Sequence, residues 1–183
     1  MNEKEKMLAG KVYNPYDSEL FYDRINAKTI CQKYNQISPK EIETRKNILK
    51  KLFGKTGEDI FIEPNFYCDY GYNIEAGENL YANHNLVILD CAKVRFGDNV
   101  MIGPNCGFYT ASHPVSAEER IQGIEFAKPI TVGNNVWFGG NVCVMPGVTI
   151  GDNVVIGGGS VVVKDIPSNV VACGNPCKPV KTL

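Results

Sequence analysis

The stretch FGDNVMIGPNC, residues 96–106, repeats its own pattern after six residues. In each half an apolar residue precedes a glycine, and a small or β-branched residue follows that glycine three positions later. The same unit recurs along the chain, and the gaps between six glycines are 6, 30, 6, 12 and 6 residues. These glycines are Gly97, Gly103, Gly133, Gly139, Gly151 and Gly157. Since every gap is a multiple of six, the sequence predicts a repeat architecture.

A period of six suits neither an α-helix, which repeats every 3.6 residues, nor a single long strand, which alternates every two. It fits a short strand followed by a tight corner, repeated around a coil. We expect the apolar residue to point inward and the small residue to fill the crowded corner. Glycine and asparagine accept backbone conformations that branched residues resist. Gly-Asp-Asn at 97–99 and 151–153 and Gly-Asn-Asn at 133–135 have this corner chemistry.

The predicted coil occupies residues 58–167, and its pattern has three irregularities. The phase shifts by two residues near 68–76 and again near 88–96, which predicts two short insertions. The pattern then fails over 111–129, a charged segment that predicts a loop projecting from the coil. A long insertion in a regular scaffold usually carries function. Residues 168–183 form a C-terminal tail.

Residues 1–57 carry no repeat and predict a helical segment of about two helices that packs against the coil. Asp17 precedes an amphipathic stretch, and residues 38–41 have the Ser and Glu spacing of a capping box, with proline at the first helical position. Gly54 is the expected C-cap. The apolar residues expected in the two helices are Leu20, Phe21, Ile25 and Tyr34, then Ile42, Leu49, Leu52 and Phe53.

The composition excludes several classes of protein. Lys and Arg number 19 against 20 Asp and Glu, so the net charge of -1 gives no global electrostatic case for nucleic acid binding. Hydrophobic residues at 44% argue against general disorder, and no apolar run reaches the roughly 18 residues of a membrane span. The charged start lacks the apolar core of an export signal, so a cytoplasmic location is expected. The seven cysteines are then expected to be reduced and mostly buried.

The repeats resemble those of the hexapeptide-repeat acyltransferases, and further motifs resemble the maltose/galactoside O-acetyltransferase family among them. The motifs are NPYDSEL at 14–20, CDYGYN at 68–73, YAN at 81–83, ILD at 88–90, NVWFG at 135–139, PGVTIG at 146–151 and GNP at 174–176. The resemblance covers nearly the whole chain. It implies a mainly β fold, a left-handed parallel β-helix with three hexapeptides per triangular coil. The handedness comes from the resemblance alone, because the general rule for parallel crossovers predicts a right-handed path.

His113 opens the projecting loop in a Thr-x-x-His-Pro pattern that resembles the catalytic histidine of this family. A neutral imidazole is suited to removing a hydroxyl proton near pH 7. Glu125, at the far end of the loop, is either the partner that orients this histidine or a solvated loop charge. The second histidine, His84, is expected to be structural or a surface residue.

The resemblance also implies which residues contact the acceptor sugar: Asp17, Asp69, Asn83 and Asp90, with Asn83 counted beside His113 and Glu125 in the catalytic set. Carboxylates and amides suit vicinal hydroxyls as hydrogen-bond partners. Asp17 is equally a helix N-cap, and Asp90 equally a turn residue. Cys91 stands where galactoside enzymes carry a second aspartate, which leaves galactoside specificity open.

The implied contacts with acetyl-CoA lie on later coils: Trp137, Gly140, Gly158, Val163, Lys164, Lys178 and Lys181. The backbone N–H of Gly140 is the candidate oxyanion donor. Lys178 and Lys181 replace arginines of the galactoside enzymes and would meet the CoA phosphates as point charges, unless they are simply a basic tail. Trp137 would flank the acetyl-CoA site or lie on an exposed face of the coil. The resemblance requires no metal.

The function predicted from these residues is direct acetyl transfer from acetyl-CoA to a hydroxyl of a sugar such as maltose, glucose or a galactoside. None of the cysteines lies in a nucleophile setting, so no acyl-enzyme is expected. A chloramphenicol-type xenobiotic acetyltransferase is the alternative enzyme, and a β-helix scaffold is the non-enzyme alternative. A γ-type carbonic anhydrase needs three zinc histidines, whereas this chain has two.

The resemblance implies a homotrimer with active sites between adjacent chains. A face of the coil must then bury apolar surface against a neighbour. The large side chains expected to lie close to that neighbour are Phe108, Tyr109, Trp137 and Phe138.

Overall fold

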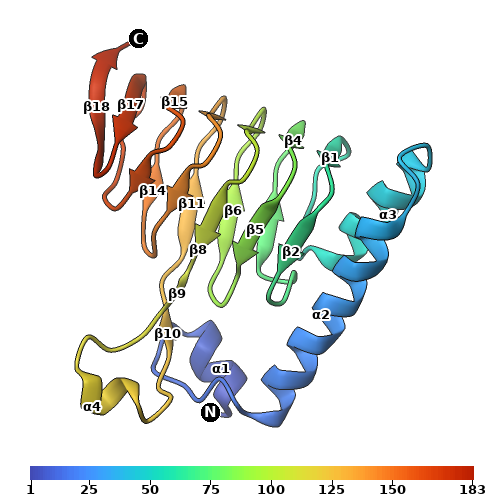
Figure 1. Ribbon diagram of the computed structural model, residues 1–183, viewed down its shortest axis with the longest axis vertical. Helices are drawn as coiled ribbons and strands as arrows, with labels where there is room; N and C mark the ends of the chain where they lie inside the picture. The colour runs from blue at the N-terminus through green and yellow to red at the C-terminus, as the bar shows by residue number, and fades with distance from the viewer.

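Three sheets form the walls of a triangular coil in the computed structural model, which describes residues 1–183 (Figure 1). The first sheet has the strand order β1-β4-β7-β12-β15-β17-β18, the second β2-β5-β8-β13-β16 and the third β3-β6-β11-β14. The chain visits the three sheets in turn, so each circuit adds one strand to every wall, parallel to the strand before it. This is the mainly β, parallel β-helix architecture that the hexapeptide repeats predict.

The strands of the coil are short, because each hexapeptide also has to supply a corner. The first sheet comprises β1 (Ile60–Ile62), β4 (Leu80–Ala82), β7 (Met101–Ile102), β12 (Trp137–Phe138), β15 (Val154–Ile156), β17 (Val170–Gly174) and β18 (Cys177–Thr182). The second comprises β2 (Phe66–Cys68), β5 (Leu86–Leu89), β8 (Gly107–Tyr109), β13 (Cys143–Val144) and β16 (Val161–Val162). The third comprises β3 (Ile74–Ala76), β6 (Val94–Phe96), β11 (Ile130–Val132) and β14 (Thr149–Ile150).

The register between successive coils confirms the predicted insertions. β1 pairs with β4, and β3 with β6, at a spacing of 20 residues, whereas β11 pairs with β14 at a spacing of 18. β6 pairs with β11 at a spacing of 36 residues, twice the regular value, because the projecting loop leaves the coil between them. The ladders stay in register on both sides of the loop. An insertion at a corner therefore lengthens the chain without disturbing the walls.

The repeat glycines and asparagines have separate roles, which corrects the expectation that both supply corner conformations. The left-handed backbone conformation belongs to the asparagine two residues after the glycine, as in Asn99, with φ 57°, and Asn135, with φ 56°. The glycines are needed because successive coils approach closely. A Cβ atom at Gly103 would lie 2.7 Å from the carbonyl carbon of Gly139 and 2.7 Å from the nitrogen of Gly140. That separation is well inside the roughly 3.5 Å of normal van der Waals contact.

The apolar residues of the repeat point into the coil, as predicted. The residues before the six glycines are each at most 4% exposed: Phe96, Ile102, Val132, Phe138, Ile150 and Ile156. Phe108 packs edge to face between Phe96 and Phe138, with ring centroids 4.9 and 5.2 Å apart. Burial of each such ring contributes roughly 1.5–3 kcal/mol to folding. Phe108 and Phe138 are 0% exposed, so they belong to the core and not to the surface expected to meet a neighbouring chain.

Three helices precede the coil, where the sequence predicts about two: α1 (Glu3–Leu8), α2 (Ser18–Gln36) and α3 (Ile42–Leu52). The unpredicted helix α1 is too short to show a clear apolar periodicity. Its sequence signal is a capping box, in which the side chains of Asn2 and Glu5 each accept a hydrogen bond from the other's backbone N–H. Met7 on α1 is fully buried and fixes the helix to the rest of the molecule.

The ends of α3 differ from the prediction. Glu41 precedes the helix and makes no side-chain capping bond, and Ser38 lies in the turn, where its hydroxyl accepts a backbone N–H. Phe53, not Gly54, is the C-cap. Gly54 is required for a different reason, because a Cβ atom there would lie 2.3 Å from the carbonyl oxygen of Tyr72.

Only part of the predicted apolar face of α2 packs inward. Leu20 and Tyr34 are buried, but Phe21 and Ile25 are 47% and 44% exposed. The C-terminal half of α2 is attached to the first coil through Asn35, whose side chain both donates to and accepts from the backbone of Phe66. The N-terminal half diverges from the coil toward α1 (Figure 1). None of the helices is both long and apolar enough to cross a lipid bilayer.

The far end of the coil is closed by β17 and β18, which run antiparallel to each other (Figure 1). Their register shifts between Val171 and Ala172, which marks a β-bulge. β18 carries Lys178, Pro179 and Lys181, all exposed. The chain therefore has a helical cap at the start of the coil and a polar hairpin at its end.

Candidate active site

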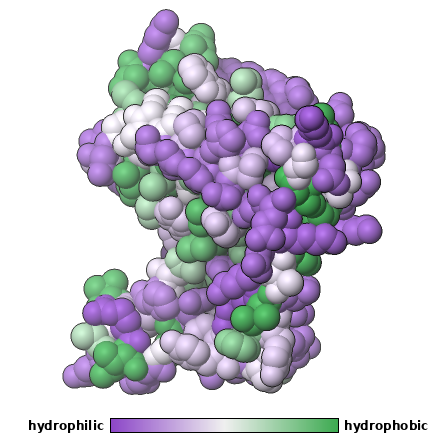
Figure 2. Space-filling model, turned by 45° about the vertical axis from the view of Figure 1, so that its right-hand side comes forward, coloured by the Kyte–Doolittle hydropathy of each residue, from purple (hydrophilic) through white to green (hydrophobic).

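The projecting loop has a two-stranded stem and a helical tip. β9 (Ala111–Ser112) and β10 (Phe126–Ala127) pair antiparallel to form the stem, and α4 (Ala117–Arg120) lies at the tip. Thr110, the first residue of the Thr-x-x-His-Pro pattern, is fully buried; its hydroxyl donates to Leu89 O and accepts from Ala92 N. These bonds anchor the stem to the preceding coil. The loop stands out from the body in Figure 2, with apolar side chains gathered on it.

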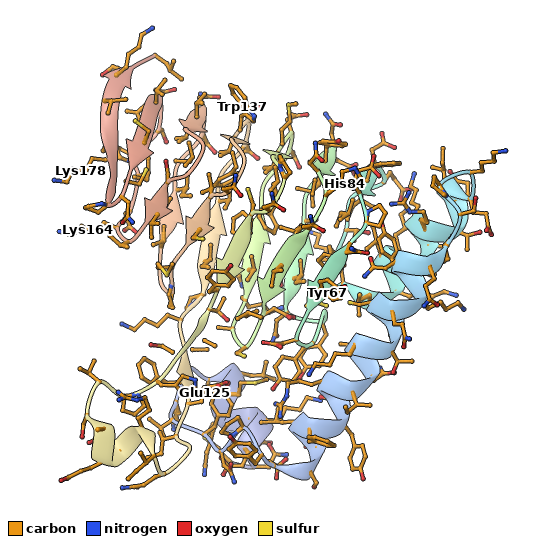
Figure 3. All side chains as sticks on the ribbon, viewed as in Figure 1. Tyr67, His84, Glu125, Trp137, Lys164 and Lys178 are labelled. Atoms are coloured by element: carbon orange, nitrogen blue, oxygen red, sulfur yellow. The ribbon has the colours of Figure 1, made fainter.

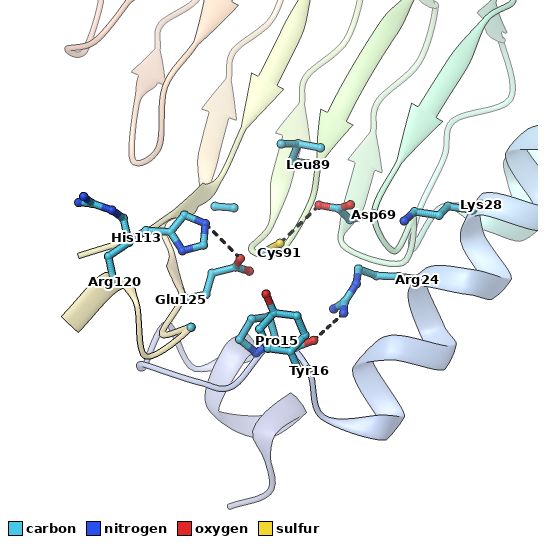
Figure 4. Close-up of a pocket in the computed structure, with 12 residues that line it drawn as sticks. Pro15, Tyr16, Arg24, Lys28, Asp69, Leu89, Cys91, His113, Arg120 and Glu125 are labelled. Atoms are coloured by element: carbon cyan, nitrogen blue, oxygen red, sulfur yellow. Dashed lines mark hydrogen bonds and ion pairs between the residues drawn. The ribbon is translucent and has the colours of Figure 1, made fainter. Parts of the chain in front are cut away.

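His113 directly follows β9, and Glu125 directly precedes β10. Both face a cavity of about 620 Å³ between the loop, α2 and the coil (Figure 4). The predicted residues that line it are Asp69, His113 and Glu125, beside Cys91. Sequence reasoning missed the remaining charged residues of the wall, which are Arg24, Lys28 and Arg120. Arg24 and Lys28 lie four residues apart on α2, and that spacing is a signal that could have placed them on one face.

The ring of His113 is held in one tautomer. Its Nδ1 atom lies 3.1 Å from the carbonyl oxygen of Ile124. A carbonyl oxygen only accepts hydrogen bonds, so Nδ1 carries the proton in the neutral ring and Nε2 carries the lone pair. The side chain is 51% exposed, which leaves Nε2 open to a molecule in the cavity.

Glu125 does not bind Nδ1, the nitrogen through which the His113 ring is held. Its Oε2 atom lies 3.7 Å from Nε2 of His113, beyond hydrogen-bond distance, while its Oε1 atom accepts a hydrogen bond from the Tyr13 hydroxyl. A carboxylate in that place favours a positive charge on the ring once Nε2 has taken up a proton. The orienting partner is the backbone of Ile124, and Glu125 is a partly buried neighbour of the basic nitrogen.

Asp69 and Cys91 form the coil side of the cavity. The Cys91 thiol lies 3.6 Å from Oδ2 of Asp69. Burial is the main reason that the pKa of Asp69 is raised, and burial likewise raises the pKa of the Cys91 thiol far above its usual value. A thiol that stays protonated is a poor nucleophile, so Cys91, the cysteine that lines this cavity, is not suited to form an acyl-enzyme.

Asp90 lies behind the cavity wall and not in it. The residue is 0% exposed, and its carboxylate accepts the backbone N–H groups of Asp69, Tyr70 and Asn73. Burial raises the pKa of Asp90 to about 6. Its side chain is not among those that line the cavity, and it holds the turn that carries Asp69. Asp17 is the N-cap of α2, accepting from Glu19 N, and its side chain does not line the cavity.

The remaining predicted residues lie elsewhere in a single chain. Asn83 and Gly140 are at the corner between the first and second sheets, and Gly158 is stacked next to Gly140. Figure 3 shows His84, the neighbour of Asn83, and Trp137 at the opposite side of the coil from Glu125. Asn83 Oδ1 accepts the backbone N–H of His84, whose own ring bonds to Pro64 O, so His84 has the predicted structural role.

The residues predicted to contact acetyl-CoA occupy three places in the chain. The N–H groups of Gly140 and Gly158 have no hydrogen-bond acceptor within the protein, as an oxyanion donor requires. Trp137 projects from the first sheet and is 54% exposed. Exposed residues at the end of the coil complete the set: Val163, Lys164, Lys178 and Lys181. Within one chain, therefore, His113 lies apart from most of the residues predicted to contact acetyl-CoA.

Two family models match the chain. Residues 6–57 match the maltose acetyltransferase hexapeptide capping motif, and residues 129–164 match six repeats of the bacterial transferase hexapeptide. The first match covers the helices and the second covers the later coils, including the stretch between β11 and β16. A coil of such repeats behind a cap of this kind is the architecture of a hexapeptide-repeat acetyltransferase.

Three solved structures similar to this chain indicate which family of hexapeptide-repeat acetyltransferases it belongs to. A maltose O-acetyltransferase from Clostridium difficile 630 is 51% identical, with a TM-score of 0.99 over 100% of this chain and 98% of the other. A galactoside acetyltransferase in complex with coenzyme A is 46% identical, with a TM-score of 0.95 over 100% and 91%. A hexapeptide-repeat acetyltransferase from Vibrio cholerae O1, complexed with acetyl-coenzyme A, is 34% identical, with a TM-score of 0.90 over 100% and 99%. The chain belongs to the maltose/galactoside O-acetyltransferase family and is an acetyl-CoA-dependent acetyltransferase.

Proposed function

We propose that the protein transfers the acetyl group of acetyl-CoA directly to a hydroxyl of a sugar, with His113 as the general base. The observation that carries this proposal is the contact between Nδ1 of His113 and the Ile124 carbonyl, because it leaves Nε2 unprotonated toward the cavity. A fixed imidazole that faces a cavity has no evident use in a β-helix scaffold. The geometry therefore favours the enzyme over the non-enzyme alternative.

In the proposed reaction, Nε2 of His113 takes the hydroxyl proton as the acceptor oxygen attacks the carbonyl carbon of the thioester. The resulting oxyanion is stabilised by a backbone N–H, for which Gly140 is the candidate. The tetrahedral intermediate collapses, the C–S bond breaks, and the departing CoA sulfur takes the proton back from the imidazolium. The carboxylate of Glu125, 3.7 Å from Nε2, favours the imidazolium while it exists.

A polyhydroxylated acceptor suits the cavity better than an aromatic xenobiotic does. Half of its twelve lining residues carry a charged side chain or an imidazole: Arg24, Lys28, Asp69, His113, Arg120 and Glu125. Such groups pair with vicinal hydroxyls. An apolar ring would instead leave partly buried polar groups such as Asp69 with fewer hydrogen-bond partners than water provides, which is costly. Asp69 is the candidate acceptor contact on the coil side, and in this proposal Asp90 acts only by positioning it.

We further propose a homotrimer in which each active site is completed by a neighbouring chain. Asn83 and Gly140 lie at one edge of the second sheet, and the His113 loop leaves from the other edge. The outward residues of this sheet carry no charge: Tyr67, Val87, Gly107, Cys143 and Val161. The third sheet, in contrast, carries the ion pair of Glu75 and Arg95. Three copies with their second sheets around one axis would bring each His113 edge to an Asn83 edge.

The experiment that tests the base is His113→Ala, with Glu118→Gln on the exposed face of the same loop as a matched control. We expect kcat to fall by about 10²–10⁴-fold, the usual contribution of a general base, and acetyl-CoA affinity measured by calorimetry to stay unchanged. Release of CoA should be followed with maltose, glucose, a galactoside and chloramphenicol as acceptors. Near-normal turnover by His113→Ala would remove the base assignment, and turnover with chloramphenicol alone would favour the xenobiotic alternative.

A further inference from the structure

Tyr13 joins the N-terminal segment to the catalytic loop. Its backbone forms an antiparallel bridge with Glu125, with N–H to O distances of 3.0 Å from Tyr13 to Glu125 and 3.2 Å in the reverse direction. Its ring is 2% exposed, in a small cluster with Met7 and Leu20 that lies apart from the main core. The Tyr13 hydroxyl donates a hydrogen bond to Oε1 of Glu125.

This hydroxyl is the one hydrogen-bond donor that the protein provides to the Glu125 carboxylate. The second oxygen, Oε2, faces Nε2 of His113 at 3.7 Å. Burial raises the pKa of the Tyr13 hydroxyl well above its usual value, so the group stays protonated and acts as a donor. The carboxylate is 14% exposed, so water has limited access to replace a missing donor.

We propose that Tyr13 is a positioning residue for acetyl transfer, because its hydroxyl fixes the Glu125 carboxylate in the orientation that supports the imidazolium form of His113. The inference rests on the proposed role of His113 as the base. It assigns a catalytic consequence to the N-terminal segment, which contributes no side chain to the reacting atoms. The other titratable or charged groups around this pair are Tyr16 before α2, Asp69 and Cys91 on the coil, Arg24 and Lys28 on α2, and Arg120 on α4.

The consequence for catalysis follows from electrostatics. A carboxylate held beside Nε2 stabilises the imidazolium that forms when the base takes the proton of the acceptor hydroxyl. When the Tyr13 hydroxyl is removed, the carboxylate is free to turn away from Nε2, and the imidazolium loses that stabilisation. The value of kcat is then expected to fall, because the imidazolium intermediate is less stable.

The test is Tyr13→Phe, which keeps the ring and removes only the hydroxyl. We expect kcat to fall about tenfold and the KM for acetyl-CoA to stay unchanged. Glu125→Gln should likewise lower kcat and leave the KM for acetyl-CoA unchanged. Adding Tyr13→Phe to Glu125→Gln should cause no further change, because the tyrosine acts through the carboxylate.

The matched control is Tyr34→Phe, which also removes a buried tyrosine hydroxyl, one that donates to Ile62 O far from the cavity. This variant should lose thermal stability and keep the wild-type kcat and KM for acetyl-CoA. The proposal is overturned if Tyr13→Phe behaves like Tyr34→Phe, or if the two changes at Tyr13 and Glu125 are additive in kcat. An active His113→Ala enzyme would instead remove the proposed function itself, so the two failures are distinguishable.

Discussion

The side-chain amide of Asn99 donates a hydrogen bond of 3.0 Å to the side-chain oxygen of Asn135, 36 residues further along the chain. The same bond recurs from coil to coil at 2.9–3.1 Å. It links one asparagine in each coil: Asn79, Asn99, Asn135, Asn153 and Asn169. Every one of them has a left-handed backbone conformation, with φ between 55° and 61°. The residue that makes the corner possible therefore also ties it to the corners above and below.

This ladder of asparagine side chains predicts that two substitutions of Asn99 lower the stability of the protein by different amounts. Asn99→Gly keeps the left-handed conformation available and removes the two ladder bonds, which costs roughly 1–3 kcal/mol. Asn99→Ala loses the same bonds and adds roughly 1 kcal/mol for a Cβ in the left-handed region. Thermal unfolding at one fixed protein concentration should therefore rank the wild type above Asn99→Gly and Asn99→Ala last. An alanine variant as stable as the glycine variant would contradict this account of the corner.

Two glycines 37 residues apart in the sequence should respond very differently to alanine. Gly103→Ala forces a Cβ to within 2.7 Å of backbone atoms in the next coil, and the cost is expected to be at least the roughly 1–3 kcal/mol of an overpacked core. At Gly140 the nearest atom to a new Cβ is 3.3 Å away, so a small local shift suffices. Thermal unfolding of both variants should therefore show a large loss of stability for Gly103→Ala and a small one for Gly140→Ala. Equal effects would contradict the close approach of successive coils as the reason for a glycine at position 103.

Asp90 predicts a pH dependence of stability with a definite sign. Its pKa is about 6 in the folded protein against 3.8 ordinarily, so between these values the folded state binds more protons than the unfolded state. Stability contributed by this group is therefore fully present below pH 3.8 and decreases as the pH rises to about 6. Asp90→Asn cannot titrate and should lack this decrease.

The measurement is the difference in unfolding free energy between the wild type and Asp90→Asn as a function of pH. The wild type should lose stability relative to the variant, by an amount of about 3 kcal/mol at most, between about pH 4 and pH 6. Asn is also expected to be less stable at every pH, because its NH₂ group cannot accept from the backbone N–H groups that the carboxylate binds. A difference that does not vary with pH would contradict the inferred burial of the carboxyl.

The proposed trimer predicts complementation between two inactive chains. Sedimentation should show a species near three times 20.2 kDa. Mixing His113→Ala chains with Asn83→Ala chains after dissociation should restore part of the activity, because some interfaces then combine an intact His113 with an intact Asn83. Each variant reassembled alone is the control. An active monomer, or verified hybrids without activity, would refute sites shared between chains.

The coil was predictable because the repeat imposes the same physical demand six times. An inward residue such as Ile102 has to be apolar, and Gly103 has to be small, so both constraints are visible in one sequence. The two-residue insertions and the loop were found for the same reason, as interruptions of a strict period. The roles of glycine and asparagine were not separable, because both residue types accept a left-handed corner and only the distance between coils distinguishes them.

The candidate site was less predictable, since its residues come from segments with no common period. His113 and Asp69 were found through motifs. Tyr13 was missed, because its partner Glu125 is 112 positions away and nothing in the local sequence shows the bridge between them. Asp90 was expected to contact the acceptor sugar or to be a turn residue, and only the fold reveals that its carboxylate accepts three backbone N–H groups.

The antiparallel hairpin at the end of the coil has a consequence for solubility. A stack of parallel rungs ends in an unpaired strand whose N–H and C=O groups could recruit the next molecule, as the growing tip of an amyloid fibril does. β18 occupies that edge in the opposite direction, with a bulge beside it and Lys178, Pro179 and Lys181 along it. Proline removes a donor from the exposed edge, and the two lysines repel a second copy of the same edge. The last six-residue strand thus keeps the coil from acting as a template for fibre growth.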